Sequence, residues 1–366
     1  MPKIPHQFEA NHVSYEVSDT CTDLEWDRFL ERTPIAQFQQ SSAWSCYKKS
    51  EGWEVIRTII RCEGSIIGGF QLLWKKFKGK RIAYLSKGPV IRDQFESLSA
   101  YVIEVLKEVV TSQRFTAVIV QAPDDCALEL LDAIDQERFI SAPFLGIIDS
   151  TLLIKLDSDS GKITNRFRKS TRNKYNKAVK NGLTFRAGTE EDLPAFFELM
   201  RSTCERQGVS PSPPNQESLY KMWSSLRPQE MIEIAFAEID GELVSGQLLI
   251  GFNGLLSLYK TGWAGAHRAL SPPSYVICEI LKRNSAGRYL KADFAGLERS
   301  LAETLLKGDK ISQKQNATRD AFKLGFGGQP KLLPTPYLWV PNPLVRICAR
   351  ATFKIPFVRS RLSRIV

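Results

Sequence analysis

Apolar and polar positions follow two similar series along the chain, one in each half. Val55 to Ile60 and Ile232 to Ala237 are strand-like apolar runs, and a turn dipeptide follows each of them, Glu63-Gly64 and Asp240-Gly241. The second dipeptide lies 177 positions after the first. Such dipeptides between strand-like runs are typical of β-hairpins. The pattern therefore predicts one antiparallel hairpin in each half of the chain.

The elements that follow each hairpin also repeat. Tyr84 and Tyr259 lie in matching predicted strands, 175 positions apart. A predicted helix comes next in each half, with apolar residues at helical spacing. Its matching positions are Val102, Val105, Leu106 and Lys107 in the first half and Ile277, Ile280, Leu281 and Lys282 in the second. Because the order and the offset are nearly constant, the sequence predicts a tandem duplicated α/β (α+β) unit with mixed, largely antiparallel sheets.

A polar, glycine-containing stretch, 157–162, separates the two copies. Thr189-Glu-Glu-Asp192 predicts a helix start in the second copy, with the threonine as cap and acidic residues in the first turn. We expect a first domain over 1–155 and a second over 156–325, which includes a basic segment at 162–180. Residues 326–366 are expected to return to the first domain and then to form a basic and apolar tail.

The composition is that of a soluble globular protein, with 43% hydrophobic and 25% charged residues. No apolar run reaches the roughly 18 to 20 residues that span a bilayer, and the first residues lack the apolar core of a secretory signal. The seven cysteines are scattered and form no Cys-x-x-Cys pair. They indicate reduced thiols in the cytoplasm, and no metal site is expected.

The net charge of +10 is concentrated in two segments. Lys162 to Lys180 contains eight basic residues and no acidic one, and no acidic residue follows Asp320. Concentrated positive charge indicates an anionic partner, such as phosphate, nucleic acid or a membrane surface. We expect the first segment to form a helix that binds phosphates, with a solvated helix face as the alternative. Its candidate polyanion-binding residues are Arg166, Arg168, Lys169, Arg172, Lys174 and Lys177.

The tail from about Tyr337 interleaves apolar residues with six basic ones, and four prolines break any long helix. This composition is typical of a segment drawn to an anionic lipid surface. We therefore expect a cytoplasmic protein that lies peripherally at the inner face of the cell membrane. A tail packed on the domain is the alternative.

Four stretches carry a resemblance to one family. They are Gln40-Ser-Ser-Ala-Trp44-Ser-Cys-Tyr-Lys48, Ala83-Tyr-Leu-Ser-Lys87-Gly88-Pro89-Val90, the basic run followed by Asn181-Gly182, and Phe322-Lys323-Leu-Gly325-Phe326-Gly327-Gly328. Glu205 to Gly208 and Asp293 to Gly296 also fit the pattern. In order and spacing these stretches resemble the FemABX family of peptidoglycan bridge-forming aminoacyltransferases, from about Phe38 to Gly328. The long helical hairpin of some members has no counterpart, so the chain resembles the compact type.

The resemblance implies two acetyltransferase-like (GNAT) domains and an acyl-transfer reaction. An amino acid esterified to tRNA passes to an amine of a lipid-linked or nucleotide-linked muropeptide, the peptidoglycan precursor. Aminoacyl-tRNA is then a co-substrate, and neither a cofactor nor a metal is implied. The reaction needs an unprotonated amine near an activated carbonyl, and a group that stabilises a tetrahedral oxyanion.

The resemblance also implies roles for six side chains. Phe322-Lys323 matches the pair at the acyl-transfer site, where a cation would stabilise the oxyanion, and Asp293 would orient the amine. Lys48, Arg206 and Tyr259 match residues that contact the substrate. Each residue also has a structural interpretation, as a loop lysine, a turn cap, a helix-dipole partner or a core aromatic.

One position departs from the family pattern. Compact members have an aspartate after the strand that corresponds to Ala117 to Val120, whereas this chain has Ala122, which cannot accept a proton. Asp124 lies two positions later. Whether it takes the role of the missing aspartate is left open, and so is the identity of the acceptor substrate.

Two other function classes compete with aminoacyl transfer. One is a GNAT-type N-acyltransferase that uses acyl-CoA on a cell-envelope polysaccharide precursor, and the other is a non-catalytic polyanion- or membrane-binding protein. The sequence has no Gln/Arg-x-x-Gly-x-Gly/Ala motif of the kind that cradles a pyrophosphate at a helix start. Its absence favours aminoacyl-tRNA over acyl-CoA as the donor.

Overall fold

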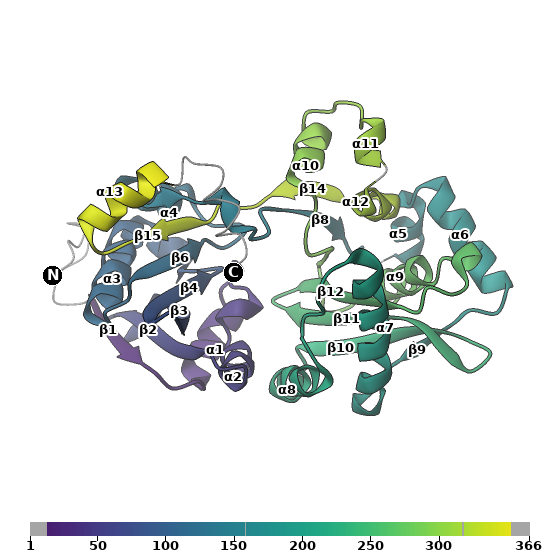
Figure 1. Ribbon diagram of the computed structural model, residues 1–366, viewed down its shortest axis with the longest axis horizontal. Coiled ribbons are helices and arrows are strands. Elements are labelled where there is room, and N and C mark those ends of the chain that lie inside the picture. Colours follow the sequence, from purple (N-terminus) through teal and green to yellow (C-terminus); the bar gives the residue numbers. More distant parts are fainter. Residues whose placement is uncertain (1–12, 158, 317, 353–366) are drawn as a thin grey trace. The chain divides into compact units, whose positions relative to one another are not determined.

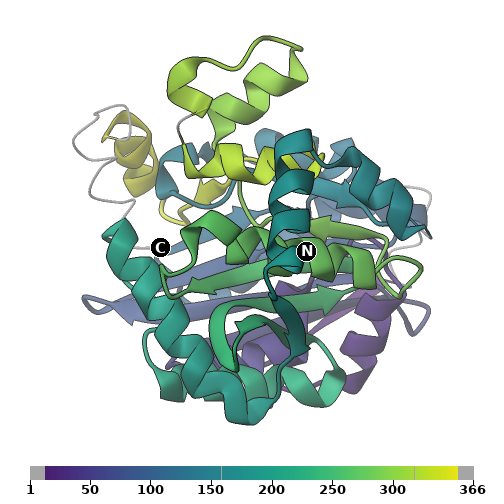
Figure 2. The same ribbon diagram turned by 90° about the vertical axis from the view of Figure 1, so that its right-hand side faces the viewer.

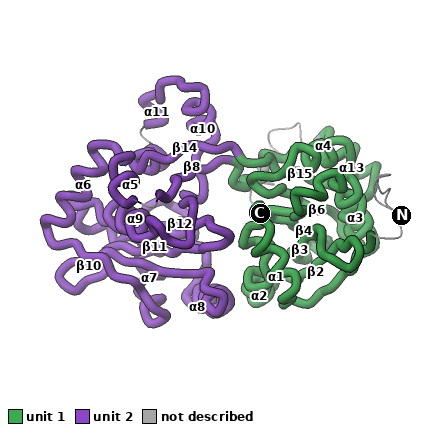
Figure 3. The backbone as a smooth tube through the Cα atoms, turned by 180° about the vertical axis from the view of Figure 1, so that it is seen from behind, with its two compact units in different colours: residues 1–149, 333–366 green, residues 150–332 purple. Residues whose placement is uncertain are grey.

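A computed structural model describes residues 13–157, 159–316 and 318–352. The chain divides into two compact units, residues 1–149 with 333–366 (unit 1) and residues 150–332 (unit 2), which Figure 3 shows in two colours. Each unit has one mixed β-sheet with helices packed on it, as Figure 1 shows.

Unit 1 combines most of the first half of the chain with a short C-terminal segment. Its strands are β1 (Val13–Ser18), β2 (Glu54–Cys62), β3 (Ser65–Phe77), β4 (Lys80–Ser86), β5 (Val90–Ile91), β6 (Ala117–Gln121), β7 (Ile140–Ser141) and β15 (Tyr337–Trp339). Its helices are α1 (Leu24–Glu31), α2 (Ser42–Ser50), α3 (Ser99–Ser112), α4 (Leu128–Gln136) and α13 (Pro343–Thr352), with 3₁₀ turns at Phe38–Gln40, Asp93–Leu98 and Pro143–Leu145.

Unit 2 repeats the same kinds of element. Its strands are β8 (Ser150–Lys155), β9 (Thr184–Ala187), β10 (Ile232–Ile239), β11 (Glu242–Phe252), β12 (Leu255–Trp263), β13 (Lys291–Asp293) and β14 (Gln329–Leu332). Its helices are α5 (Ser160–Arg166), α6 (Lys169–Lys180), α7 (Leu193–Gln207), α8 (Gln216–Leu226), α9 (Pro272–Arg283), α10 (Arg299–Leu306), α11 (Gln313–Asn316) and α12 (Arg319–Lys323). Further 3₁₀ turns lie at Glu190–Asp192, Arg227–Gln229, Arg268–Leu270 and Leu324–Phe326.

The two hairpin turns confirm the sequence repeat in backbone detail. Both residues of Glu63-Gly64 and of Asp240-Gly241 have positive φ, between 49° and 82°. A tight turn between twisted antiparallel strands requires such values, and glycine adopts them without strain. Each hairpin also has a register shift near its turn, after Ile60 in β2–β3 and after Ala237 in β10–β11. These two positions are again 177 residues apart.

Both sheets have the same strand order. Unit 1 runs β1-β2-β3-β4-β6-β15-β7, with β5 beside β3, and unit 2 runs β9-β10-β11-β12-β13-β8-β14. Each sheet contains one parallel pair among its antiparallel pairs. The parallel pair is β4 with β6 in unit 1 and β12 with β13 in unit 2. The predicted fold class, tandem α/β (α+β) units with mixed and largely antiparallel sheets, is confirmed.

The two sheets exchange one strand each. β8 follows β7 in the chain, yet it pairs with β13 and β14 of unit 2. β15 follows β14 in the chain, yet it pairs with β6 and β7 of unit 1. By strand order, β8 takes the same place in unit 2 that β15 takes in unit 1. Each sheet is therefore completed by the strand that follows, in the chain, the edge strand β7 or β14 of the other sheet.

This exchange shifts the domain boundaries from the expected ones. The units divide between 149 and 150 and between 332 and 333, whereas the sequence pattern placed the boundaries after 155 and 325. By local pattern, β8 is the last apolar strand before the polar stretch 157–162. Its pairing with β13, Leu153 opposite Asp293, places it in unit 2, and β14 pairs with β8 up to Leu332. Local patterns do not show which distant strand will be the partner.

Helices α7 and α9 cover opposite faces of the unit 2 sheet. Ala235 and Ala237 of β10 belong to the core cluster that contains Cys278 of α9. Phe236, between them, packs edge-on against Phe196 of α7, with ring centroids 6.4 Å apart. Successive side chains of a strand point to opposite faces, so β10 is buried on both sides.

The helices are of moderate length. Among the described helices, α7 is the longest, with 15 residues. The segment that carries α10 and α11 projects from the rest of unit 2, as Figures 1 and 2 show. Within the described ranges, no helix combines the length and the hydropathy needed to cross a bilayer.

The buried aromatic residue Phe326 offers a test of the unit 2 core. It is 1% exposed, and its ring lies 5.2 Å from that of Phe294 and 5.8 Å from that of Phe167. We expect Phe326→Ala to lower the stability of unit 2 by about 3–5 kcal/mol, because it removes these contacts and leaves a cavity. Denaturant unfolding would measure the loss. Leu290→Ala, at a position that is 69% exposed, should change the stability by less than about 0.5 kcal/mol; equal losses in the two variants would contradict this view of the core.

Candidate functional site

The end of β13 and the turn after it form the centre of the candidate site. Asp293 is the buried last residue of β13. Its Oδ1 accepts hydrogen bonds from the Thr151 hydroxyl and, at 2.8 Å, from the Ala295 N–H. The Gly296 N–H donates to Thr151 Oγ1 at 3.1 Å. The Asp293 carboxylate therefore holds the turn 294–296 against β8; its role in orienting an amine stays a prediction.

Lys323 is brought to the same turn. It is the last residue of α12, and its Nζ donates to the Gly296 carbonyl and lies 3.0 Å from Asp320 Oδ1. An ammonium group has three N–H donors, so these two described partners leave one for an oxygen of a ligand. Lys323 and Asp293, which are 30 positions apart in the sequence, thus meet at one turn.

Asp320 connects this lysine to the start of α10, and the sequence analysis did not identify it. Its Oδ2 accepts the Glu298 N–H at 2.7 Å, while Oδ1 faces Lys323. The i,i+3 spacing of Asp320 and Lys323 is the one signal that the sequence contains. That signal is common on exposed helices and does not reveal the bond to Glu298. In the structure, Asp320 fixes the position of the Lys323 ammonium relative to the turn.

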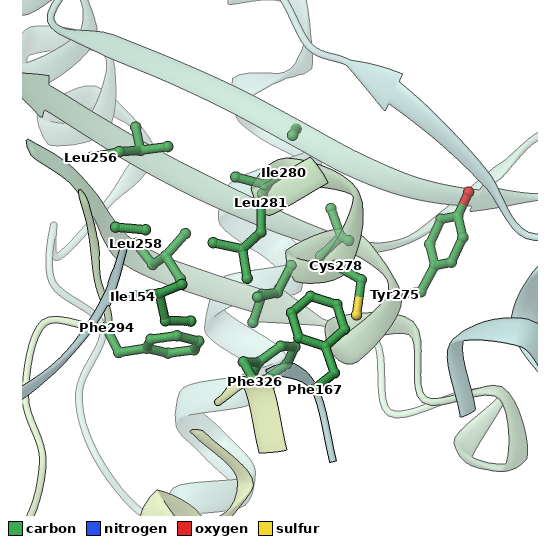
Figure 4. Packing of buried hydrophobic residues seen from close by; sticks show 14 of the residues in the cluster. Ile154, Phe167, Leu256, Leu258, Tyr275, Cys278, Ile280, Leu281, Phe294 and Phe326 are labelled. Carbon is green, nitrogen blue, oxygen red and sulfur yellow. The ribbon is translucent and has the colours of Figure 1, made fainter. Parts of the chain in front are cut away.

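Phe322 lies at the exposed border of this site. It is 42% exposed, and its ring meets that of Phe326 edge-on at 5.2 Å. Behind it, Phe326 packs with Phe294 and Phe167, as Figure 4 shows. This buried cluster supports both the turn and α12, and Phe322 adds an apolar surface next to Lys323.

The basic run 162–180 forms two helices, which corrects the prediction of one. α5 ends at Arg166 and α6 begins at Lys169. Phe167 between them has an extended ψ of 140°, and its side chain is buried against Phe326. The Arg168 N–H donates to the Gly325 carbonyl at 2.9 Å. The chain leaves the helical path here because Phe167 enters the core.

The structure uses two of the six candidate polyanion-binding residues internally. Arg166 forms an ion pair with Asp157 and donates to the Lys155 carbonyl at 2.9 Å. Arg172 donates to the carbonyls of Asn165 and Phe167, at the end of α5. The other four, which are exposed on α6 or at its start, are Arg168, Lys169, Lys174 and Lys177. These four are exposed to a polyanion and have no described ion-pair partner, whereas Arg166, although exposed, is paired with Asp157.

Tyr175 holds α6 to α9. Its hydroxyl donates to the Glu279 carboxylate and accepts from Lys282, and its ring stacks on that of Tyr275 at 5.7 Å. Burial and the hydrogen bond to Glu279 raise the pKa of Tyr175, so the hydroxyl stays protonated as a donor at neutral pH. The basic helix is thus fixed to the core through one face.

Arg206 lies at the junction of α7 and β12. α7 ends at Gln207, with Gly208 at a φ of 66°. The Arg206 guanidinium donates to Ser202 Oγ at 2.7 Å and to the Trp263 carbonyl, and it lies over the Trp263 ring at 4.9 Å. The residue is exposed, so its contacts leave a surface for a ligand while they fix its direction.

Tyr259 lies at an irregularity in β12. Leu258 is opposite Leu249 and Lys260 is opposite Leu248, so Tyr259 is the extra residue of a bulge. Bulges redirect side chains and often lie next to functional sites. Burial lowers the pKa of the neighbouring Lys260. The ligand contact expected of Tyr259 stays a prediction.

Lys48 lies in unit 1 among three aromatic rings. Its Nζ is 5.3 Å from the ring centroid of Trp44, 5.5 Å from that of Tyr47 and 5.6 Å from that of Trp53. Each distance is within the range of a cation–π interaction. Trp44 and Lys48, four positions apart, lie on one face of α2, and the rings hold the ammonium in one place.

The residues before Lys48 explain why its helix is rigidly placed. The Gln40 side chain donates to the Ser86 carbonyl at 2.6 Å and accepts the Gln71 N–H at 2.7 Å. Ser41 Oγ accepts the Trp44 N–H at 3.2 Å and so caps α2. The motif Gln40-Ser-Ser-Ala-Trp44 therefore attaches the start of α2 to β3 and β4.

The position of Ala122 is buried, and the nearby acidic residue is used in an ion pair. Asp124 pairs with Lys87, and its Oδ2 accepts the Gln37 side-chain N–H at 2.9 Å. This network is largely buried, so Asp124 serves to hold Lys87 and Gln37.

In the described part of the chain, no group of three or more His, Cys, Asp or Glu side chains is placed to hold a metal ion.

The start of α9 is poorly suited to bind a phosphate. Its first two residues are Pro272 and Pro273, which have no N–H. The next two N–H groups, of Ser274 and Tyr275, both donate to the Ser271 carbonyl, at 2.9 and 3.1 Å. A helix N-terminus binds anions through unpaired N–H groups, so the first turn of α9 offers none.

Comparisons with known proteins agree with this architecture. The FemAB family model matches residues 21–142, and the model of the acetyltransferase (GNAT) domain matches residues 165–299. The crystal structure of FemX is similar with a TM-score of 0.76 at 18% identity, and the match covers 91% of this chain and 99% of FemX. A conserved protein from Bacteroides thetaiotaomicron VPI-5482 is similar with a TM-score of 0.55 at 11% identity, over 88% of this chain and 99% of that protein. At these identities the structural matches support the fold alone.

A curated relative adds evidence from sequence. The lipid II:glycine glycyltransferase of Staphylococcus aureus (strain MRSA252) is 28% identical over 200 residues, which cover 51% of this chain and 47% of the relative. The chain thus spans about half the length of the curated relatives that it matches. Together with the two family models, this match is evidence of common descent. Residues 21–142 therefore resemble the FemAB family, and residues 165–299, in the second unit, resemble an acetyltransferase (GNAT) domain.

Proposed function

We propose that the protein transfers an amino acid from an aminoacyl-tRNA to an amine of a lipid-linked peptidoglycan precursor. The FemAB match supports this reaction class, as do the curated relatives, which are lipid II glycyltransferases. Because a lipid-linked acceptor is held in a membrane, the reaction would take place at the inner face of the cell membrane.

The observation that carries this proposal is the position of Lys323. Its ammonium lies at the turn after β13, between the Gly296 carbonyl and Asp320. A cation that is fixed by two partners and has one donor left can stabilise a negative oxygen without reorganising. This is the property that acyl transfer requires of the group that faces the oxyanion.

The proposed chemistry forms one bond and breaks another. The acceptor amine attacks the ester carbonyl, and the carbonyl oxygen becomes an oxyanion that Lys323 would stabilise. The tetrahedral intermediate then releases the tRNA ribose oxygen, the amide bond remains, and the amine proton ends on the ribose hydroxyl. Phe322 would line the approach to this centre with an apolar surface.

The tRNA would be held by α6 and the residue before it. Arg168, Lys169, Lys174 and Lys177 are exposed, and no acidic residue lies between Lys162 and Lys180. Phosphate contacts give affinity and position but do not read base identity. We therefore assign donor binding to this surface, and not the choice of amino acid.

Acyl-CoA is the second candidate donor, because unit 2 matches an acetyltransferase domain. Acetyltransferases of this type cradle the pyrophosphate of CoA with N–H groups at a helix start. The first turn of α9 has no such donors, since two of its residues are prolines and two N–H groups are bonded to Ser271. The corresponding helix of unit 1, α3, follows a 3₁₀ turn that contains Asp93 and Glu96, which would repel a pyrophosphate.

A transfer assay distinguishes the two donors. Purified protein, a charged tRNA and a nucleotide-linked muropeptide should give an amide product, detected by mass spectrometry. The ester is already activated, so no other co-substrate should be needed. Acetyl-CoA should not replace the charged tRNA. Acylation from acetyl-CoA without tRNA would refute the proposed donor.

Lys323→Ala should lower turnover by roughly 100- to 1000-fold, because an oxyanion contact acts mainly in the transition state. The KM for both substrates should change little. Lys310→Ala, at an exposed position between α10 and α11, is the matched control and should retain wild-type turnover. Equal turnover in the two variants would remove Lys323 from the mechanism.

A charge reversal tests the proposed tRNA surface. Lys169→Glu/Lys174→Glu/Lys177→Glu should weaken tRNA binding and lower the slope of log affinity against log salt by about 2, since each lost phosphate contact lowers it by about 0.7–0.9. Lys307→Glu/Lys310→Glu/Lys314→Glu changes the net charge by the same amount, also at exposed positions of unit 2. If both triple variants lose affinity equally, the effect is one of overall charge and the surface is wrongly assigned.

A further inference from the structure

Helix α13 is attached to unit 1 in an unusual orientation. It begins after Asn342, whose Oδ1 accepts the N–H groups of Leu344 and Val345 at 3.0 and 3.1 Å. In Figures 1 and 3 it lies beside α4. The Arg350 guanidinium donates to the carbonyl of Arg138, just after α4, at 2.8 Å.

Arginines form the side of α13 that contacts the unit. Arg346 lies over the Trp339 ring of β15 at 5.4 Å and donates to the Pro341 carbonyl at 3.3 Å. Arg346 and Arg350 are four positions apart and therefore share one helix face. Both guanidiniums point to the protein, so the contact with unit 1 is made by cations, a ring and backbone oxygens.

The apolar side of α13 faces solvent. Leu344 is 72% exposed, Val345 is 49% exposed and Ile347 is 65% exposed. Leu344 and Ile347 are three positions apart and lie on one face, which Val345 borders. A helix on the surface of a globular protein usually turns its apolar stripe to the core, whereas α13 turns it outward. An outward apolar face of this kind indicates a binding surface.

The charge of the C-terminal segment that carries this face favours one kind of partner. No acidic residue follows Asp320 in the sequence, and the residues after α13 add Lys354, Arg359, Arg361 and Arg364. A second copy of the chain would bring the same cationic segment against itself, and the segment 353–366 folded onto α13 would add its own cations to those of Arg346 and Arg350. An anionic lipid surface complements both features, because it offers hydrocarbon to the apolar face and negative charge to the cations.

We propose that α13 rests its face of Leu344, Val345 and Ile347 on an anionic membrane surface, while its arginines hold the helix to unit 1. This surface is separate from the acyl-transfer chemistry of unit 2, and neither proposal depends on the other. The helix lies in the plane of the interface and does not span the bilayer.

Vesicle sedimentation of the full chain tests this proposal. Wild-type protein should bind vesicles of equimolar phosphatidylcholine and phosphatidylglycerol, bind pure phosphatidylcholine weakly, and be partly released as salt is raised. Leu344→Ser/Ile347→Ser should lower partitioning to the anionic vesicles on the order of tenfold or more, because two apolar side chains no longer insert. Val17→Ser/Leu24→Ser, at exposed apolar residues on β1 and α1, is the control and should bind as the wild type does.

Three outcomes would overturn the proposal. They are failure of the wild type to bind anionic vesicles, wild-type binding by Leu344→Ser/Ile347→Ser, and a wild-type dimer in light scattering that this variant converts to a monomer. The third outcome would assign the face to a second copy of the chain. Circular dichroism would show that both double variants are folded. Transfer to a water-soluble, nucleotide-linked acceptor should be unchanged in the α13 variant, so a failure of the proposed activity is recognised independently of lipid binding.

Discussion

The contact between the Lys323 ammonium and the Gly296 carbonyl closes an excursion of the chain on which the candidate site depends. The chain leaves β13, forms α10 and α11, and returns through α12 to the same turn. Asp320 strengthens the closure, since its carboxylate binds both Lys323 and the Glu298 N–H. The packing of Phe326 against Phe294 also joins the two ends of the excursion, within a core cluster that includes Leu297, Leu301 and Leu324. In the proposed mechanism the same cation that closes this segment would face the reacting oxygen, which would couple the shape of the site to its chemistry.

The exchange of β8 and β15 imposes a second constraint, at the level of topology. Each sheet has a strand next to its parallel pair, and that strand follows, in the chain, the edge strand β7 or β14 of the other sheet. Asp293 lies on β13 opposite Leu153 of β8, and Thr151 of β8 donates to its carboxylate. The buried end of the candidate site is therefore assembled by the exchanged strand. A truncation that removed β8 with the first half of the chain would remove a partner of Asp293.

The sequence predicted those features that depend on local pattern. Glu63-Gly64 and Asp240-Gly241 indicated both hairpins, because positive φ at a turn requires particular residues. The capping box of Thr189 and Asp192 is also present. The partner of β8, the break at Phe167 and the link from Asp320 to Glu298 were not predicted. Each depends on a contact between residues that are distant in sequence, or on a side chain that enters the core, and periodicity contains neither kind of information.

The same limit applies to charge. The run from Lys162 to Lys180 has a uniform composition, yet Arg166 and Arg172 bind Asp157 and backbone carbonyls, and Lys169, Lys174 and Lys177 remain exposed. In α13, likewise, Arg346 and Arg350 attach the helix and its apolar residues are left outside. Guanidinium groups suit these internal tasks because a planar fork can bind several oxygens at once and stack on a ring. Counting cations locates a basic segment, but only their partners separate the ones that build the fold from the ones that can meet an anion.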